Sequence, residues 1–228
     1  MKHDVTIASK RIGDGSPTYI VLEAGPTHGG FSGASEIIKA AARGGVDAIK
    51  FQIFAASDVM HDRDLEFAYE ILVDKETGET RTVSQPLFEI LQERELTAGE
   101  WADIADLSHA LDLAIFFTVG TIADVEFVQR IGGDSIKIAS GDITHRRLIE
   151  QAAQTGLPIQ FDSGGGSVSE ILRALEWAGS QSAWAGSVLH HCATGYPARP
   201  EAVRVTNISR LREEFNCPIA FSDNSPGW

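Results

Sequence analysis

The stretch that decides the fold is DAIKFQIF, residues 47–54, in which apolar side chains run almost without interruption around one lysine. A strand with one face in water alternates apolar and polar residues, whereas a strand covered on both faces is apolar almost throughout. Six further stretches have the same character: YIVLEAG (19–25), LAIFFTV (113–119), DSIKIAS (134–140), LPIQFDS (157–163), SVLHHC (187–192) and CPIAFSD (217–223). The sequence therefore predicts seven strands in a parallel sheet that is buried on both faces.

Helical segments separate most of these strands. Apolar residues recur every three or four positions across 34–42, 148–153 and 171–178, which is the spacing of one buried helix face. Capping signals mark three helix starts, since Thr97, Thr121 and Ser167 each precede a carboxylate by three residues. The distance between most strand starts is the length of one βα unit, which favours a barrel over an open sheet.

We therefore expect an α/β fold of the (β/α)8 TIM-barrel type, truncated after the seventh strand. A closed barrel has no unpaired strand edges, so we expect the native protein to continue past Trp228 with an eighth strand. We expect residues 1–17 to form a hairpin that caps the barrel and residues 18–228 to form the barrel itself. The long insert 55–96 lies where barrels often carry loops that shape substrate access.

Composition argues against several classes of function. The formal net charge of -13 disfavours nucleic acid and anionic membranes as partners, because both require clustered lysine and arginine. Apolar runs are too short to cross a bilayer, and the first residues do not resemble a secretory signal. The 2 cysteines lack metal or disulfide spacing, which predicts a reducing compartment and a cytoplasmic location.

Polar residues gather at the carboxyl ends of the predicted strands, where a barrel carries its active site. In chain order they are Glu23, His28, Lys50, Gln52, Thr118, Lys137, Ser140, Asp142, Asp162, Ser163, His191, Thr194, Tyr196, Ser222, Asp223 and Asn224. We expect these side chains to converge on one mouth. His190 should point to the opposite side of its strand, away from the mouth. Trp101 and its neighbours predict helix packing on the outside of the barrel.

Lys50 and Lys137 each lie inside an apolar strand. A buried ammonium group is costly unless it meets water, a carboxylate or a bound anion. Two of them facing one cavity predict a ligand with phosphate or carboxylate groups. The alternative is structural pairing with Glu23 or Asp142. Glycines 164–166, before a capped helix, are compatible with an anion on backbone N–H groups, and also with an ordinary turn.

Seven motifs follow one another in a fixed order along the chain: EAGPTHGG (23–30), DAIKFQ (47–52), LFEILQERELT (87–97), IKIASGDIT (136–144), TGLPI (155–159), HCATGYP (191–197) and SDNSPG (222–227). Together they resemble the sialic acid synthase family, which includes synthases for N-acetylneuraminate, legionaminate and pseudaminate and proteins similar to spore coat polysaccharide synthases. The resemblance covers nearly the whole chain. It implies a TIM-barrel transferase that joins phosphoenolpyruvate to the aldehyde of an N-acetylated hexosamine, giving a nine-carbon 2-keto sugar acid and phosphate.

The resemblance also implies roles for residues at matching positions. Glu23 and Asp142 would lie beside the reacting carbons as catalytic groups, with His28 as a third candidate. Tyr196 would contact the sugar. Lys50, Thr118, Lys137 and Ser140 would hold the phosphoenolpyruvate, with Ser222 contributing from the seventh strand. Their places at the strand ends add Gln52, Asp162, Ser163 and Thr194 to the substrate-binding set that also includes Tyr196. A divalent metal, manganese or magnesium, would assist, with Asn224 as the candidate ligand in this chain.

Four residues depart from the family pattern. Asn224 stands where the family has a metal-binding histidine, Thr194 where asparagine is common, and Thr27 where asparagine precedes His28. Asp162 stands where serine is common, and its carboxylate would repel a phosphate unless it were protonated, bridged by metal or turned away. These departures suggest a different sugar preference or impaired catalysis.

Two further functions fit the residues. A Schiff-base aldolase would use Lys137 or Lys50 as its nucleophile. A noncatalytic sugar-phosphate-binding homologue would account for Asn224. The resemblance also implies a homodimer for the full-length protein, because family members usually add a C-terminal antifreeze-like domain that reaches into the partner subunit; residues 18–228 do not include it.

Overall fold

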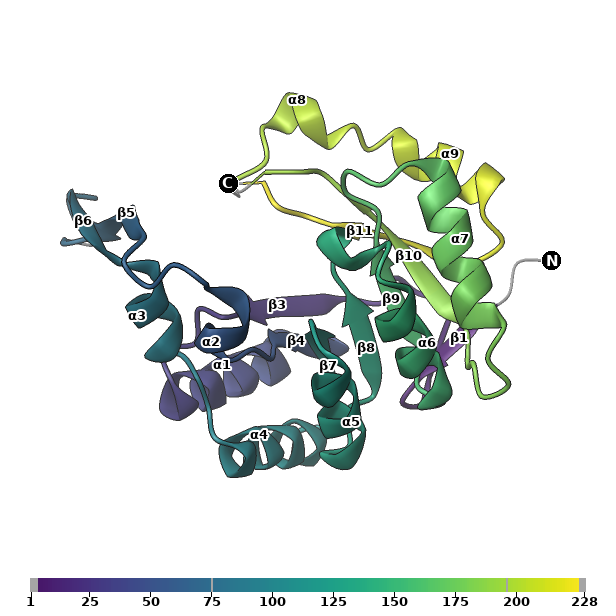
Figure 1. The fold of residues 1–228 in the computed structure, drawn as a ribbon, viewed down its shortest axis with the longest axis horizontal. Coiled ribbons are helices and arrows are strands. Elements are labelled where there is room, and N and C mark those ends of the chain that lie inside the picture. The colour runs from purple at the N-terminus through teal and green to yellow at the C-terminus, as the bar shows by residue number, and fades with distance from the viewer. Residues whose placement is uncertain (1–3, 75, 196, 226–228) are drawn as a thin grey trace.

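A curled sheet of seven parallel strands forms the centre of the molecule, in the order β11-β10-β9-β8-β7-β4-β3 (Figure 1). The computed structural model describes residues 4–74, 76–195 and 197–225. The sheet strands are β3 (Val21–Gly25), β4 (Ala48–Gln52), β7 (Ala114–Val119), β8 (Ser135–Ile138), β9 (Ile159–Asp162), β10 (Ser187–Cys192) and β11 (Ile219–Ser222). Their spatial order follows the chain, as in a barrel, which confirms the predicted α/β class and all seven strands. β3 and β11 are the two edges of the sheet.

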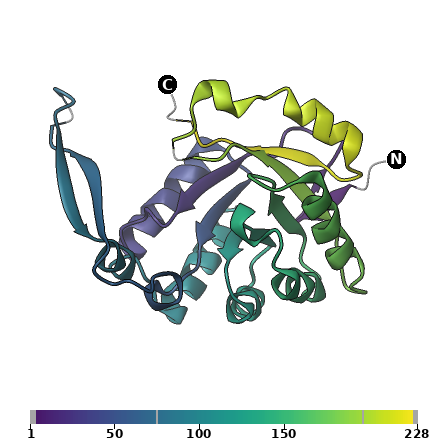
Figure 2. The ribbon, with the colours of Figure 1, turned by 45° about the horizontal axis from the view of Figure 1, so that its top comes forward.

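Helices cover the convex face of this sheet (Figure 2). They are α1 (Phe31–Gly44), α4 (Ala98–Ala110), α5 (Ile122–Arg130), α6 (Arg146–Gln154), α7 (Val168–Gly179) and α9 (Asn207–Glu214), with the short α8 (Pro200–Val203) before the last of them. The three predicted capping boxes all form, at Thr97, Thr121 and Ser167. Each satisfies backbone N–H groups that a helix start otherwise leaves free.

Two apolar cores lie on opposite faces of the sheet. Between sheet and helices, Phe117 and Trp101 belong to a large cluster, which confirms that Trp101 packs outside the barrel. On the concave face, Phe116 belongs to a smaller cluster with residues near the amino ends of the strands. Consecutive residues of one strand thus point to opposite cores, and both phenylalanines are fully buried. Each buried phenylalanine contributes roughly 1.5–3 kcal/mol to folding.

The hairpin of β1 (Val5–Ile7) and β2 (Lys10–Ile12) lies at the amino ends of the barrel strands. Val5 and Ile7 are buried in the inner core, where they join Ala48 and Val188. Their side chains therefore fill the floor of the curled sheet.

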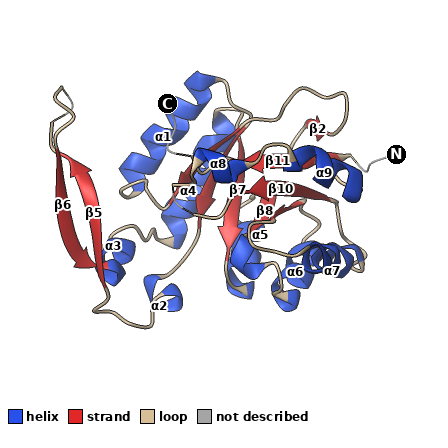
Figure 3. Ribbon diagram, turned by 90° about the horizontal axis from the view of Figure 1, so that it is seen from above, coloured by secondary structure: helices blue, strands red, loops and turns tan. Residues whose placement is uncertain are grey.

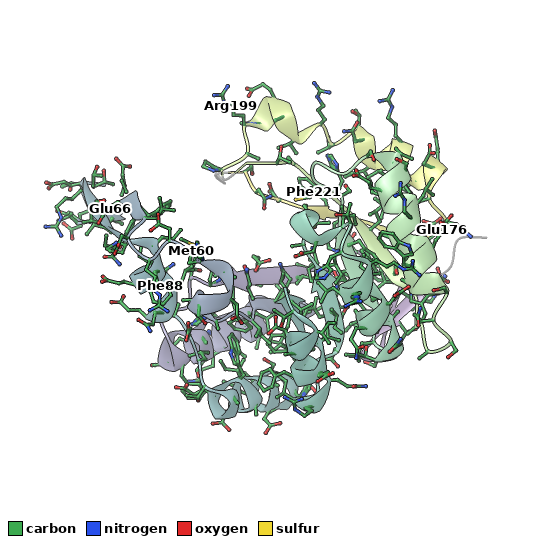
Figure 4. The ribbon with its side chains drawn as sticks, in the orientation of Figure 1. Met60, Glu66, Phe88, Glu176, Arg199 and Phe221 are labelled. Carbon is green, nitrogen blue, oxygen red and sulfur yellow. The ribbon has the colours of Figure 1, made fainter. Side chains whose placement is uncertain are left out.

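The insert 55–96 contains α2 (Ala56–Val59), an antiparallel hairpin of β5 (Glu66–Leu72) and β6 (Thr80–Pro86), and α3 (Leu87–Gln92). The hairpin projects away from the barrel in two views (Figures 1 and 3). Glu66 lies on the projecting part and Phe88 at its base (Figure 4). Phe88 is buried, with the Arg63 guanidinium carbon 4.5 Å from its ring centroid, and α3 contacts α2 and β6, so α3 packs within the insert.

Candidate active site

A pocket of about 930 Å³ lies on the concave face of the sheet, and both edge strands contribute to its lining. The residues predicted for the mouth that line it are Glu23, Lys50, Lys137, Asp162, Ser222, Asp223 and Asn224. They come from the carboxyl ends of five different strands and the turn after β11. The strand ends therefore bring together charged groups of both signs, as the sequence pattern predicts.

Lys137 is held by a carboxylate on the next strand. Its Nζ lies 2.8 Å from Oδ1 of Asp162, and the exposed fractions of the two side chains are only 2% and 14%. Lys137 faces Gln160 across the β8–β9 pair, and Asp162 follows two residues later on the same face. The alternative prediction, that Asp142 pairs with one of the lysines, is wrong. The Asp142 carboxylate lies instead 3.8 Å from His145.

The pairing of Asp162 with Lys137 explains how a carboxylate can lie in a site that the sequence predicts to bind anions. Burial raises the pKa of Asp162, but the Lys137 charge, His190 and a hydrogen bond from Ser222 together lower it below its usual value. Asp162 is thus ionised, and its charge is balanced by Lys137. Breaking such a buried pair by removing one partner typically costs about 3–5 kcal/mol.

Lys50 lies across the same pocket and pairs with Glu23. Its Nζ also donates to the Thr118 hydroxyl at 3.2 Å. Burial lowers the pKa of Lys137, Asp162 raises it in part, and the positive charge of Lys50 lowers it further. The two ammonium groups therefore share one cavity, and each already has a carboxylate partner.

His190 lies inside the pocket, so the prediction that it points away from the mouth is wrong. Its Nε2 lies 2.7 Å from Oε1 of Gln160 and its Nδ1 lies 3.1 Å from the Ser222 hydroxyl. His191 takes the outer face, with Nε2 2.6 Å from the carbonyl oxygen of Val203. Both faces of β10 are buried, so the sequence has no exposed polar face that would show which residues of β10 point into the barrel.

Burial lowers the pKa of His190 well below its ordinary value, and the charges of Lys137 and Lys50 lower it further against the opposing effect of Asp162. His190 is therefore neutral near pH 7. Gln160, its buried partner, was not among the candidate residues. The signal was present, because Gln160 is a polar residue in an apolar strand, two positions before Asp162.

His28 packs in the outer layer rather than in the pocket. Its ring lies edge-on to Phe51 and Trp101 at centroid distances of 6.0 and 5.8 Å. Nδ1 accepts a hydrogen bond from the Gly30 N–H at 3.2 Å, and Nε2 has no partner among the described residues. Burial lowers the pKa of His28. This placement gives no support to a catalytic role in the pocket.

The remaining predicted residues divide between several places. Ser163 and Thr194 line a second pocket of about 490 Å³ on the outer side, together with His191. Gln52 and Thr118 lie at the carboxyl ends of β4 and β7, and Ser140 and Asp142 lie in the short 3-10 helix η1 (Ser140–Asp142) directly after β8. Tyr196 lies outside the described residues. The expectation of one shared mouth is therefore too broad.

Within residues 4–74, 76–195 and 197–225, no group of three His, Cys, Asp or Glu side chains is arranged to hold an ion. Nδ2 of Asn224 donates to the Ala193 carbonyl oxygen at 3.1 Å and lies 3.4 Å from Sγ of Cys192. The Asn224 side-chain N–H group thus contacts the last residue of β10 and the residue that follows it.

In the described part of the chain, no helix combines the length and apolarity needed to cross a membrane.

Comparison with known proteins identifies relatives of one kind. The chain is 30% identical to the spore coat polysaccharide biosynthesis protein SpsE of Bacillus subtilis over 222 residues, 96% of this chain and 56% of that protein. It is 27% identical to the N,N'-diacetyllegionaminic acid synthase of Legionella pneumophila over 221 residues, 94% of this chain and 60% of that protein. The chain therefore spans less than two thirds of the length of these relatives.

Solved structures and a family model agree with these relatives. The crystal structure of N-acetylneuraminic acid (sialic acid) synthetase from Leptospira borgpetersenii matches with a TM-score of 0.84 at 26% identity, covering 100% of this chain and 72% of that chain. The family model described as the NeuB family matches residues 37–228. Because that match covers most of the sequence, the chain belongs to the NeuB family.

Proposed function

We propose that this chain forms the catalytic barrel of a sialic-acid-type synthase, a transferase that makes a carbon–carbon bond. The substrates are phosphoenolpyruvate and an N-acetylated hexosamine in its aldehyde form, and the products are a nine-carbon 2-keto sugar acid and phosphate. Membership of the NeuB family and the relatives named as legionaminic acid and N-acetylneuraminic acid synthases support this proposal. The observation that carries it is the convergence of Lys50 and Lys137 in one pocket.

Lys50 and Lys137 are the groups that hold the donor. Phosphoenolpyruvate carries a carboxylate and a phosphate, and two ammonium groups in a partly enclosed pocket complement that charge. The Thr118 hydroxyl, already in contact with Lys50, adds a hydrogen bond at the same end. An incoming anion competes with Glu23 and Asp162 for the lysines, so donor binding rearranges both ion pairs.

The reaction forms one bond between carbons and releases one phosphate. The methylene carbon of phosphoenolpyruvate attacks the aldehyde carbon, and the aldehyde oxygen becomes a hydroxyl by taking up a proton. Water adds to carbon 2 of the donor, and loss of phosphate from that carbon leaves the keto group. Glu23 at the pocket and Asp142 after β8 are the candidates for moving protons. Burial raises the pKa of Asp142, which suits it to donate one.

The test is phosphate release from phosphoenolpyruvate by the full-length protein, measured with a panel of N-acetylated hexosamines. We expect release that depends on the sugar. Lys137→Met should reduce the rate to background, because it removes one ammonium group and leaves the Asp162 carboxylate facing the donor.

The double variant Lys137→Met/Asp162→Asn is the matched control, because it removes both charges of the buried pair and should restore folding without restoring turnover. Turnover by the folded double variant would contradict the role of Lys137. Donor binding without phosphate release for any sugar would contradict the synthase and support a noncatalytic binding protein.

A Schiff-base aldolase is the second candidate, because burial and Lys50 lower the pKa of Lys137 and so favour the free amine that forms imines. Borohydride treatment with a 2-keto acid distinguishes the two functions. A covalent mass increase at Lys137 would support the aldolase, and an unmodified lysine in a protein that releases phosphate would exclude it.

A further inference from the structure

Hydrogen-bonded groups from β8, β9, β10, β11 and the residue before β9 form a continuous row on the inside of the barrel, next to Lys137. We refer to it as the polar row. In order it consists of the Pro158 carbonyl oxygen, the Ser135 hydroxyl, the Gln160 amide, the His190 imidazole, the Ser222 hydroxyl and the Asp162 carboxylate, joined at 2.8, 3.2, 2.7, 3.1 and 2.9 Å. Its last member is the partner of Lys137. The polar row thus ends at the proposed donor site.

The polar row is one proton short when His190 is neutral. Both ends, the Pro158 carbonyl and the ionised Asp162, accept hydrogen bonds only. Each of the four groups between them can donate only one proton along the row, yet the row contains five contacts. One contact therefore brings two acceptors together.

Changing the orientation of a group moves this shortage without removing it. If Nε2 of His190 donates to Gln160, the single Ser222 proton must serve both Nδ1 of His190 and Asp162. If the Gln160 amide is turned over and His190 donates from Nδ1, the single Ser135 proton must serve both Gln160 and the Pro158 carbonyl. A proton added to His190 satisfies every contact, because an imidazolium donates from both nitrogens.

Nearby charges decide whether that proton is present. The charged groups that line the pocket with His190 are Lys137 of β8, Asp162 of β9, Lys50 of β4, Glu23 of β3, Asp223 after β11, and Asp14 with Arg212, which pair with each other. Burial, Lys137 and Lys50 lower the pKa of His190, while Asp162 raises it. An anion that neutralises the two lysines removes their repulsion of an imidazolium at this position, which otherwise adds to the larger cost of burial.

We propose that His190 is a positioning residue that takes up one proton from solvent when the anionic donor binds. The proton goes to Nδ1 of His190, which then donates to the Ser222 oxygen, and the Ser222 hydroxyl donates to Asp162. Asp162 keeps a hydrogen-bond donor and a nearby positive charge while Lys137 turns to the donor. The inference rests on the proposed function, and it explains how a carboxylate is tolerated beside a bound phosphate.

Calorimetry of phosphoenolpyruvate binding in buffers of different ionisation enthalpy tests the proposal. The measurement belongs near pH 8, where a phosphate ester with a second pKa of about 6 is already doubly ionised and any proton gained belongs to the protein. We expect uptake that approaches about one proton per bound donor as the pH is lowered toward 7, and binding that tightens in the same direction.

Two variants should bind the donor without proton uptake, for different reasons. His190→Gln keeps a donor for Gln160 but has no titratable group, so it cannot take up the missing proton. Asp162→Asn supplies an N–H to Ser222 and so removes the shortage itself. His191→Gln is the matched control, because His191 is the next residue on the same strand, faces outward and keeps its hydrogen bond to Val203. It should leave proton uptake unchanged.

Nitrogen NMR of the wild-type imidazoles decides the matter if a variant fails to fold. The His190 ring nitrogens should move from the shifts of a neutral ring to those of an imidazolium on addition of phosphoenolpyruvate. Unchanged His190 shifts, or undiminished uptake in His190→Gln, would overturn the inference while leaving the synthase proposal in place. If neither phosphoenolpyruvate nor inorganic phosphate produces a binding signal, both proposals are overturned.

Discussion

At the scale of single residues, four strands of the barrel, β3, β4, β8 and β9, each place one charged side chain in the pocket. On β8 the inward side chains are Ser135 and then Lys137, while Ile136 and Ile138 face the helices. A lysine in an apolar strand can be recognised from the sequence because its burial demands a partner. The partner itself cannot be identified from the sequence. The true partner, Asp162, lies on another strand, and Asp142, which follows β8 directly, looks equally suitable.

Two buried histidines make the folded state sensitive to mild acid. Burial lowers the pKa of His28 and of His190, whereas an unfolded chain has histidine pKa values of about 6.5. Below that value the unfolded chain binds more protons, so the free energy of unfolding should fall as pH decreases, by up to about 1.4 kcal/mol per pH unit for each histidine.

Urea unfolding between pH 7.5 and pH 5 measures this slope. His190→Gln should flatten it, and His61→Gln, in the exposed part of the insert, serves as the control for removing a histidine. A slope in His190→Gln equal to that of the wild type would contradict a neutral, buried His190.

At the scale of elements, local signals in the sequence proved reliable. The capping boxes at Thr97, Thr121 and Ser167 involve residues three positions apart, so their formation depends little on the rest of the fold. The insert was expected only as a long loop, and the structure shows the β5–β6 hairpin within it. Its strands expose most of their side chains and have no apolar core to reveal them.

The hairpin should be dispensable for folding of the barrel. Its base is narrow, since the Leu87 N–H donates to the Leu65 carbonyl oxygen at 2.9 Å, so a short Gly-Ser linker can replace residues 66–86. We expect the shortened protein to keep cooperative thermal unfolding with a midpoint within a few degrees of the wild type, because the removed strands are mostly exposed and the buried residues Phe88 and Ile90 remain. Calorimetry of both proteins measures this, and loss of a cooperative transition would show that the hairpin supports the barrel.

At the scale of the whole molecule, the sheet is curled but open between β3 and β11. Each of these strands pairs with one neighbour in the described sheet, whereas β7 and β8 have a neighbour on both sides. The open seam lies beside the pocket, so the edge strands that carry Glu23 and Ser222 also form its walls. Order in the site therefore depends on the part of the sheet with the fewest hydrogen bonds.

Hydrogen exchange should reveal this gradient. The amides of β7 (Ala114–Val119) should exchange most slowly, and those of β3 and β11 faster, because edge strands open without disrupting the central sheet. Exchange monitored by mass spectrometry or NMR on the chain of residues 1–228 measures the difference. Equal protection of β3, β11 and β7 would show that the seam is closed in solution.

The sequence by itself determined the alternation of strands and helices, the helix caps and the presence of two lysines that needed anionic partners. These features depend on spacings within a few residues or on the cost of burying one charge. Only the tertiary structure decided that His190 faces inward, that Lys137 pairs with Asp162, and that Ser163 and Thr194 lie in a different pocket. The physical reason is that a strand buried on both faces shows no polar side, and its contacts are chosen by neighbouring strands.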